Sequence, residues 1–270
     1  MATLAVWEPG GESDRRAERW NQAIARRHSV RTYDGTPLSP DDASALAGLR
    51  PLQLGTARIR HVLIQGDEAL ARIMRGLVGG YGKLVGAPAL VAFVAQTQDP
   101  GHTAGLGYLG QQVVLEAVSR GLSTCWVAGA FRRDAVREYA DLAEGEDVLC
   151  ISPIGRAAET AGLRRFHDAS MKWLTPGHGK RKPLAEIVRG EVTEPWLARA
   201  LEAARWAPSA VNRQPWLFTV LDGGRVSLTC SGAAESKQAL DCGIAMANFA
   251  IAAQSQGAAG VWKLHVPDKL

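Results

Sequence analysis

Basic side chains gather in three short stretches of the sequence, and such clusters commonly bind anions. The stretches are residues 15–31 (RRAERWNQAIARRHSVR), 164–166 (RRF) and 179–183 (GKRKP). Arg27 and Ser29 follow a predicted helix over 13–26, in a turn from which a guanidinium and a hydroxyl could both donate to phosphate oxygens. Acidic residues are interleaved and no nucleic-acid recognition module is visible, so a local site for a cofactor phosphate explains the clusters best. The alternative is a solvated basic helix end, which the helix dipole favours.

Neither a nucleotide loop nor a metal site is predicted. The segment 76–84 (GLVGGYGKL) fails the GxxxxGK[ST] spacing, because the residue five before Gly82 is Leu77 and Leu84 follows Lys83. The cysteines and the six histidines are dispersed, without CxxC or HxxxH pairs. We expect the cysteines to be small buried apolar residues; they are Cys125, Cys150, Cys230 and Cys242.

The composition is that of a soluble globular protein. Of the 270 residues, 46% are apolar and 21% are charged, and the net charge is +4. No stretch approaches the roughly 20 apolar residues of a membrane span. The start of the chain, MATLAVWEPGGESDRR, reaches polar and acidic residues too early for a signal peptide. We therefore expect a cytoplasmic protein in which residues 1–270 form one compact unit.

The elements that must position the basic clusters occur twice along the chain. Residues 39–50 (SPDDASALAGLR) align with 193–205 (TEPWLARALEAAR), and each segment predicts a short helix with proline in its first turn. A strand is predicted after each helix, over 60–65 and 215–221. Chance similarity between alanine-rich helices is the alternative to a true repeat.

A second pair of segments extends the repeat. Residues 107–126 align without a gap on 243–262, and both predict a long helix that ends at a glycine, Gly121 or Gly257. Because these helices are apolar on nearly all sides, they should be buried and pack against each other.

The two halves are unequal in length. The first carries an additional helix and strand over 67–95, and continues past Trp126 through a helix near 132–142 to a strand at 148–155. The second has only the short VSLTC (226–230) and a polar turn at the corresponding place. We assign the first half-repeat to about 20–156, a linker or lid to about 157–182, and a shortened half-repeat to about 183–264.

Three segments resemble the nitroreductase-like family of FMN-dependent oxidoreductases. ARRHSVR (25–31) resembles its opening Arg-x-Ser-x-Arg motif, and APSAVNRQPW (207–216) its APSxxNxQPW loop. GLSTCWVAGAF (121–131), with KRKPLAEIV (180–188), is similar to two further family segments. The resemblance implies an α+β nitroreductase-like fold, with a central mixed sheet flanked by helices.

The distribution of the motifs departs from the family pattern. The family carries both motifs in one subunit, and its intertwined dimers hold each flavin with one motif from each subunit. Here one good copy of each lies on opposite halves, and the first-half counterpart of the loop, PLQLGTAR (51–58), lacks the signature. The chain therefore resembles a single-chain branch, in which a monomer is an intramolecular pseudo-dimer with one flavin site across its halves.

The resemblance also implies roles for individual residues. Arg27, Ser29 and Arg181 match phosphate-side positions. The positions that match the pyrimidine edge of the flavin are Arg31 and Lys83, where a cation stabilises the charge of the reduced ring. The backbone N–H of Gly129 is expected to point at flavin N5, where hydride is transferred. The full set of expected cofactor contacts is Arg27, His28, Ser29, Arg31, Lys83, Ala128, Gly129, Lys180, Arg181, Pro208, Ser209, Ala210, Asn212 and Gln214.

The implied function is hydride transfer from NAD(P)H through FMN to a nitroaromatic, quinone or similar small-molecule acceptor. Neither nucleic acid nor a membrane is expected as a partner. A different class of function is a protein that stores FMN without efficient turnover, and a weaker third is a basic nucleic-acid-binding protein. The irregular segment 158–179, with Phe166 and Trp173, is interpreted as a lid over the flavin, with disorder as the alternative.

Overall fold

The chain folds into two compact units, in which helices accompany β-sheets as the predicted α+β class requires. The computed structural model describes residues 3–12, 14–54, 57–75, 84–96, 99–129, 131–159, 180–231 and 236–264. Unit 1 comprises Met1–Ala25, Gln98–Gln112 and Gly179–Leu270, and unit 2 comprises Arg26–Thr97 and Val113–His178. The segment interpreted as a lid lies outside the described residues from position 160 to 179.

Unit 2 contains a five-stranded sheet in the order β2-β3-β4-β6-β5, with every neighbouring pair antiparallel. The strands are β2 (Leu52–Leu54), β3 (Ala57–Gln65), β4 (Ala89–Ala95), β5 (Ser123–Thr124) and β6 (Asp147–Gly155). All seven residues of β4 are buried, because this apolar strand lies at the centre of the sheet with both faces covered.

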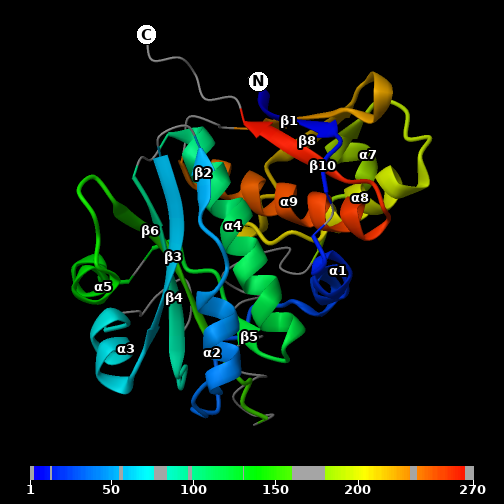
Figure 1. Ribbon diagram of the computed structural model, residues 1–270. Helices are drawn as coiled ribbons and strands as arrows, with labels where there is room; N and C mark the ends of the chain where they lie inside the picture. Colours follow the sequence, from blue (N-terminus) through cyan, green and yellow to red (C-terminus); the bar gives the residue numbers. More distant parts are fainter. Residues whose placement is uncertain are drawn as a thin grey trace. The chain divides into compact units, whose positions relative to one another are not determined.

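Three helices of unit 2 are α2 (Pro40–Ala47), α3 (Asp67–Ile73) and α5 (Arg133–Ala140). The side chain of Ser39 caps α2 by accepting from the N–H of Asp42, and proline stands in the first turn as predicted. Figure 1 shows α3 and α5 side by side next to the sheet, and they share its core with strand residues such as Leu90 and Ile151.

Unit 1 contains a second five-stranded sheet, in the order β10-β1-β9-β8-β7. Its strands are β1 (Thr3–Pro9), β7 (Val188–Arg189), β8 (Trp216–Val220), β9 (Val226–Cys230) and β10 (Gly260–Leu264). The β7–β8 pair is parallel and the other pairs are antiparallel, so this sheet is mixed. The sequence predicted a central mixed sheet, whereas the described strands form one sheet in each unit.

The two sheets share one strand order. The series β2-β3-β4-β6-β5 corresponds to β7-β8-β9-β1-β10, so β1 takes the place in unit 1 that β6 takes in unit 2. β1 therefore completes the second sheet from the opposite end of the chain, and Figure 1 shows this first strand beside β10, the last.

The two long helices are α4 (Pro100–Ser119) and α9 (Ser236–Ser255), and α9 lies against the unit 1 portion of α4. A Cβ atom at Gly107 would lie 2.2 Å from the carbonyl oxygen of Leu240, and one at Gly243 would fall on the carbonyl oxygen of Ala104. Only glycine permits this approach of two backbones, so the predicted packing of the long helices is confirmed. The amide of Gln111 also donates to Asn248 Oδ1 over 2.9 Å at this crossing.

The remaining elements of the described chain position the candidate site or border it. They are α1 (Ala17–Arg26), α7 (Leu184–Ile187), α8 (Pro195–Arg205) and the short 3₁₀ turns η1 (Ala210–Asn212) and η2 (Asp222–Gly224). The predicted helix ends at Gly121 and Gly257 are confirmed, since both glycines follow their helix with a left-handed φ, of 80° and 78°. Among the helices in the described ranges, none has the length and apolar character to span a membrane.

Candidate functional site

The residues predicted to contact the cofactor fall into two groups, one in each unit. Unit 2 carries Arg27, His28, Ser29, Arg31, Ala128 and Gly129, and unit 1 carries Lys180, Arg181, Pro208, Ser209, Ala210, Asn212 and Gln214. Lys83 lies outside the described residues.

In unit 1 the segment after α8 is a turn with strained backbone. Val211, Asn212 and Gln214 have φ values of 46°, 57° and 50°, in the left-handed region that favours glycine. Val211 is β-branched and its side chain is 61% exposed, so burial of that side chain does not offset the strain. Such conformations cost about 1–3 kcal/mol each and persist only where surrounding contacts hold them, which occurs most often at ligand sites.

Hydrogen bonds inside unit 1 hold this turn. The Ser209 hydroxyl accepts from the N–H of Gln214 over 2.9 Å, and Gln214 Oε1 accepts from the N–H of Lys182 over 2.9 Å. The amides of Asn212 and Gln214 both donate to the carbonyl oxygen of Lys180, over 2.8 and 3.2 Å. These bonds bring together the APSAVNRQ turn and the KRK segment, which are far apart in sequence.

Arg181 lies at the centre of this group. Its Nη1 donates to Asn212 Oδ1 over 3.0 Å, and its guanidinium carbon lies 5.6 Å from the ring centroid of Trp206. The guanidinium of Arg205 lies 5.2 Å from the same ring. Burial, and secondarily the charge of Arg205, lower the pKa of Arg181. An anion bound beside Arg181 would stabilise its positive charge and so oppose this lowering of its pKa.

Asp241 of α9 supports the turn from the core of the unit. The N–H of Ala210 donates to both carboxylate oxygens of Asp241, over 3.1 and 3.0 Å. The residue is only 4% exposed, and this burial raises its pKa to about 7, against the opposing effects of the Ala210 N–H and the charge of Arg213. The sequence analysis missed Asp241. The available signal was its position as the one acidic residue in the apolar helical stretch 239–255.

In unit 2 the segment from Ser29 to Tyr33 runs in an extended form between two neighbours. Ser29 forms a parallel bridge with Thr124, and the N–H of Val30 donates to the Thr124 carbonyl over 2.9 Å. On the other side, the N–H of Val85 donates to the carbonyl of Arg31 over 3.0 Å. Main-chain bonds on both sides therefore fix residues 29–31 of the Arg-x-Ser-x-Arg motif.

The side chains of this motif gather near a buried thiol. Burial raises the pKa of Cys125, and the charge of Arg31, the side chain of Ser29 and the charge of Arg27 oppose that rise. Cys125 is 1% exposed, and the other three cysteines are also buried and free, so the prediction of small buried residues is confirmed. His28 is exposed, with Nδ1 3.1 Å from the carbonyl oxygen of Arg26.

Ala128 and Gly129 follow Val127, which is bound to Ile151 by two main-chain hydrogen bonds of 2.9 Å. Among the described residues, nothing lies within 4 Å of the place where a Cβ atom on Gly129 would stand. A ligand could approach this backbone closely, but the role of the Gly129 N–H stays a prediction.

Each group on its own suits a ligand group that is anionic or accepts hydrogen bonds, such as the phosphate or the polar pyrimidine edge of FMN. In unit 1 the Nε of Arg181, and in unit 2 the Nε of Arg31, are buried without a hydrogen-bond acceptor among the described residues. Buried guanidinium N–H groups cost free energy unless an acceptor is supplied. The residues present therefore fit the cofactor that the resemblance implies.

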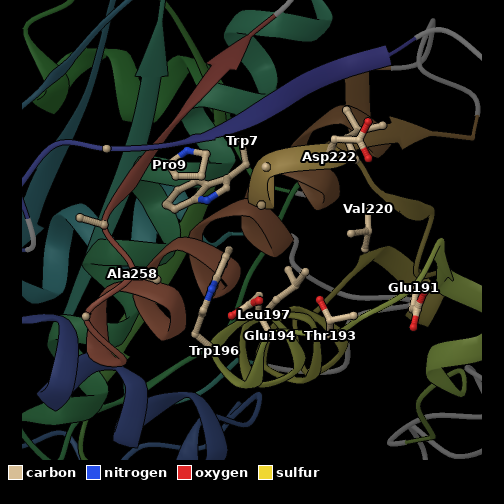
Figure 2. Close-up of a pocket in the computed structure, with 16 residues that line it drawn as sticks. Trp7, Pro9, Glu191, Thr193, Glu194, Trp196, Leu197, Val220, Asp222 and Ala258 are labelled. Carbon is tan, nitrogen blue, oxygen red and sulfur yellow. The ribbon is translucent and has the colours of Figure 1, made fainter.

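A surface pocket of about 840 Å³ lies elsewhere in unit 1. Figure 2 shows Trp7, Trp196, Val220 and Asp222 around it. None of the predicted cofactor residues lines this pocket, so cavity size alone does not locate the candidate site. Over the described ranges, no group of three or more histidine, cysteine, aspartate or glutamate side chains is arranged to hold a metal ion.

A family model described as "Putative TM nitroreductase" matches residues 20–253, a span that contains both groups of predicted contacts. The chain belongs to this nitroreductase family. No curated protein matches the chain.

A solved structure of another protein shares the fold of this chain. A Thermotoga maritima protein described as a putative nitroreductase superposes with a TM-score of 0.56 at 20% identity, covering 86% of this chain and 82% of its own. That likeness supports the nitroreductase-like α+β fold, which is confirmed. An FMN-dependent nitroreductase from Clostridium difficile R20291 matches 51% of this chain and 87% of its own, with a TM-score of 0.43 and 19% identity. A nitroreductase family protein from Clostridium novyi NT matches 52% of this chain and 86% of its own, with a TM-score of 0.44 and 17% identity.

Proposed function

We propose that the protein is an FMN-dependent oxidoreductase that takes hydride from NAD(P)H and passes it to a nitroaromatic, a quinone or a similar small acceptor. Membership of the nitroreductase family supports an oxidoreductase activity for this chain. One of the matching solved structures is described as an FMN-dependent nitroreductase. The observation that carries the proposal for this chain is the turn of residues 209–214, which is strained, held by hydrogen bonds and joined to the half-buried guanidinium of Arg181.

The residues of each unit would perform distinct tasks in this function. Arg181 supplies charge-assisted N–H donors to an anionic group, and Asn212 orients Arg181 through its side-chain oxygen. In unit 2, the guanidinium of Arg31 is a cation whose backbone is fixed by a hydrogen bond from Val85. This positive charge suits a ligand group that becomes more negative on reduction. FMN, when bound, supplies the hydride chemistry at its N5, so that no nucleophilic side chain is required.

The acceptor and the choice between NADH and NADPH are open to direct test. Purified protein should be yellow, and NADH or NADPH under nitrogen should bleach the flavin absorbance, which a nitroaromatic or quinone should then restore. If the bound flavin stays oxidised with both nicotinamides, the protein stores FMN and the proposed oxidoreductase activity is wrong. If no flavin binds, the cofactor assignment itself is wrong.

The proposal also covers how the chain is organised and where it is located. It includes the half-repeat boundaries, a cytoplasmic location and a monomer that is complete by itself. The shared strand order of the two sheets supports the half-repeats, because β8 and β9 correspond to β3 and β4 in both order and direction.

A further inference from the structure

The carboxylate of Asp241 lies directly beneath the strained turn of unit 1. Both of its oxygens accept the N–H of Ala210, the first residue of η1, over 3.1 and 3.0 Å. Ala210 is followed at once by Val211 and Asn212, the first two residues with a left-handed φ. The bond therefore fixes the backbone at the point where the strain begins.

The same bond links the apolar core to the group that contacts the ligand. Asn212 is held in the turn by two main-chain bonds, in which its own N–H donates to the Ser209 carbonyl and the next N–H along the chain donates to the Ala210 carbonyl. The side-chain oxygen of Asn212 then accepts from Arg181 over 3.0 Å and orients it. Loosening the Ala210 N–H would allow the turn to relax from its strained conformation. Arg181 would then lose its orienting oxygen.

We propose that Asp241 is a positioning residue whose state of ionisation sets how firmly the turn 209–214 is held for the flavin. This proposal rests on the proposed function. The ionised carboxylate accepts a charge-assisted hydrogen bond from Ala210, which is stronger than the bond to a neutral carboxylic acid. Binding of the flavin is therefore tighter when Asp241 has lost its proton.

The groups around Asp241 place this change near neutral pH. Burial raises the pKa of Asp241 to about 7, while the positive charge of Arg213 from the turn opposes that rise. On α9 itself the neighbour is Cys242, a buried free thiol that lies near the thiol of Cys230 of β9. Burial raises the pKa of Cys242, so this thiol is neutral while Asp241 titrates.

A measurement on the flavin-free protein tests the proposal without any turnover. The amide ¹⁵N and ¹H shifts of Ala210 should titrate between pH 5.5 and 8.5 with a midpoint near 7 in the wild type. The titration should vanish in Asp241→Asn, which keeps an acceptor but cannot ionise. It should persist in the control Asp222→Asn, a change at an exposed aspartate of the same unit. A flat wild-type profile, or a titration that survives in Asp241→Asn, would overturn the proposal.

Flavin binding supplies the functional readout. The Kd for FMN, from the quenching of its fluorescence, should rise between pH 8 and pH 6 more in the wild type than in Asp241→Asn, by about three- to tenfold. Ionisation of the FMN phosphate affects both proteins equally, so the ratio isolates Asp241. Tight FMN binding with parallel pH profiles would overturn this inference alone, whereas no FMN binding by either protein at any pH would overturn the proposed function.

Discussion

The segments 207–216 and 51–58 occupy the same place in the two halves of the chain, yet they fold differently. Each follows a short helix that begins with proline, α8 or α2, and each precedes a strand, β8 or β3. In unit 2 the segment becomes β2, which pairs with β3 in the register Leu52↔Ile59. In unit 1 it becomes a turn with three left-handed residues held by side-chain hydrogen bonds.

The two segments differ in whether polar side chains or strand pairing satisfy their backbone groups. In the β2–β3 hairpin the backbone satisfies its donors and acceptors by strand pairing. In the turn of unit 1, Ser209, Gln214 and Asp241 satisfy backbone groups instead, and the backbone adopts conformations that it would otherwise avoid. We infer that the hairpin serves stability and that the turn serves binding.

The largest effect on stability is expected from Asp241→Asn. A folded-state pKa of about 7, against the usual 3.8, means that the folded protein holds this proton more tightly than the unfolded chain. Its contribution to wild-type stability is therefore fully present below about pH 4 and is lost as the pH rises through 7. Asp241→Asn should be more stable than the wild type at pH 8, by roughly 2–4 kcal/mol, and nearly equal to it at pH 4.

Urea unfolding at pH 4, 6 and 8 measures this difference. A stability gap that does not change with pH would mean that Asp241 is ionised throughout and that burial does not control its proton.

The next largest effect, on cofactor binding, is expected when the guanidinium that is bonded to the turn is removed. Arg181→Ala should raise the free energy of FMN binding by about 1.5–3 kcal/mol, the range for hydrogen bonds to charged groups. We expect the same for Arg27→Ala in unit 2. The control is Arg189→Ala, an exposed arginine of unit 1 whose guanidinium donates to the backbone of α7 and β7. Fluorescence titration with FMN gives the three constants, and unchanged values for Arg181→Ala and Arg27→Ala would contradict the site assignment.

A matched pair of amide deletions tests the two segments against each other. Asn212→Ala removes the oxygen that orients Arg181, and should weaken FMN binding by about 1 kcal/mol or more. Gln53→Ala, in the counterpart strand β2, should leave FMN binding unchanged. The flavin content of both proteins after identical dialysis provides the measurement. Equal loss of flavin would show that the hairpin is also part of the site.

The smallest effect concerns the strain itself. Val211→Gly should remove the cost of a β-branched residue at a φ of 46° while losing little burial, because the side chain is 61% exposed. The larger backbone entropy of glycine in the unfolded chain offsets part of this gain, so we expect a rise in stability of about 0.5–1 kcal/mol. A lower Tm for the variant would indicate that Val211 is not strained.

Local signals in the sequence predicted most of the helices. Proline at the start of α2, and the glycines after α4 and α9, act within one turn of the helix, so their effect is visible without tertiary structure. The motif residues Arg181, Asn212 and Gln214 were identified by resemblance, and the hydrogen bonds among them were not predicted.

The packing of the two long helices was predicted, but other features that depend on distant segments were not. Nothing in residues 3–9 specifies that they pair with residues more than 200 positions later, because strand pairing is set by the whole fold. Asp241 was missed for a related reason, since its partner Ala210 lies 31 positions earlier in a loop. The left-handed φ of Val211 contradicts the preference of that residue, and only the surrounding bonds explain it.

The ratio of flavin to protein chain tests the account most directly. FMN released by heat from the purified protein and measured by absorbance should equal one per chain, in a preparation whose mass in solution is that of a single 28.8 kDa chain. One flavin per monomer would agree with a chain that carries one intact copy of each motif. Two flavins per chain, or binding that occurs only in a dimer, would contradict it.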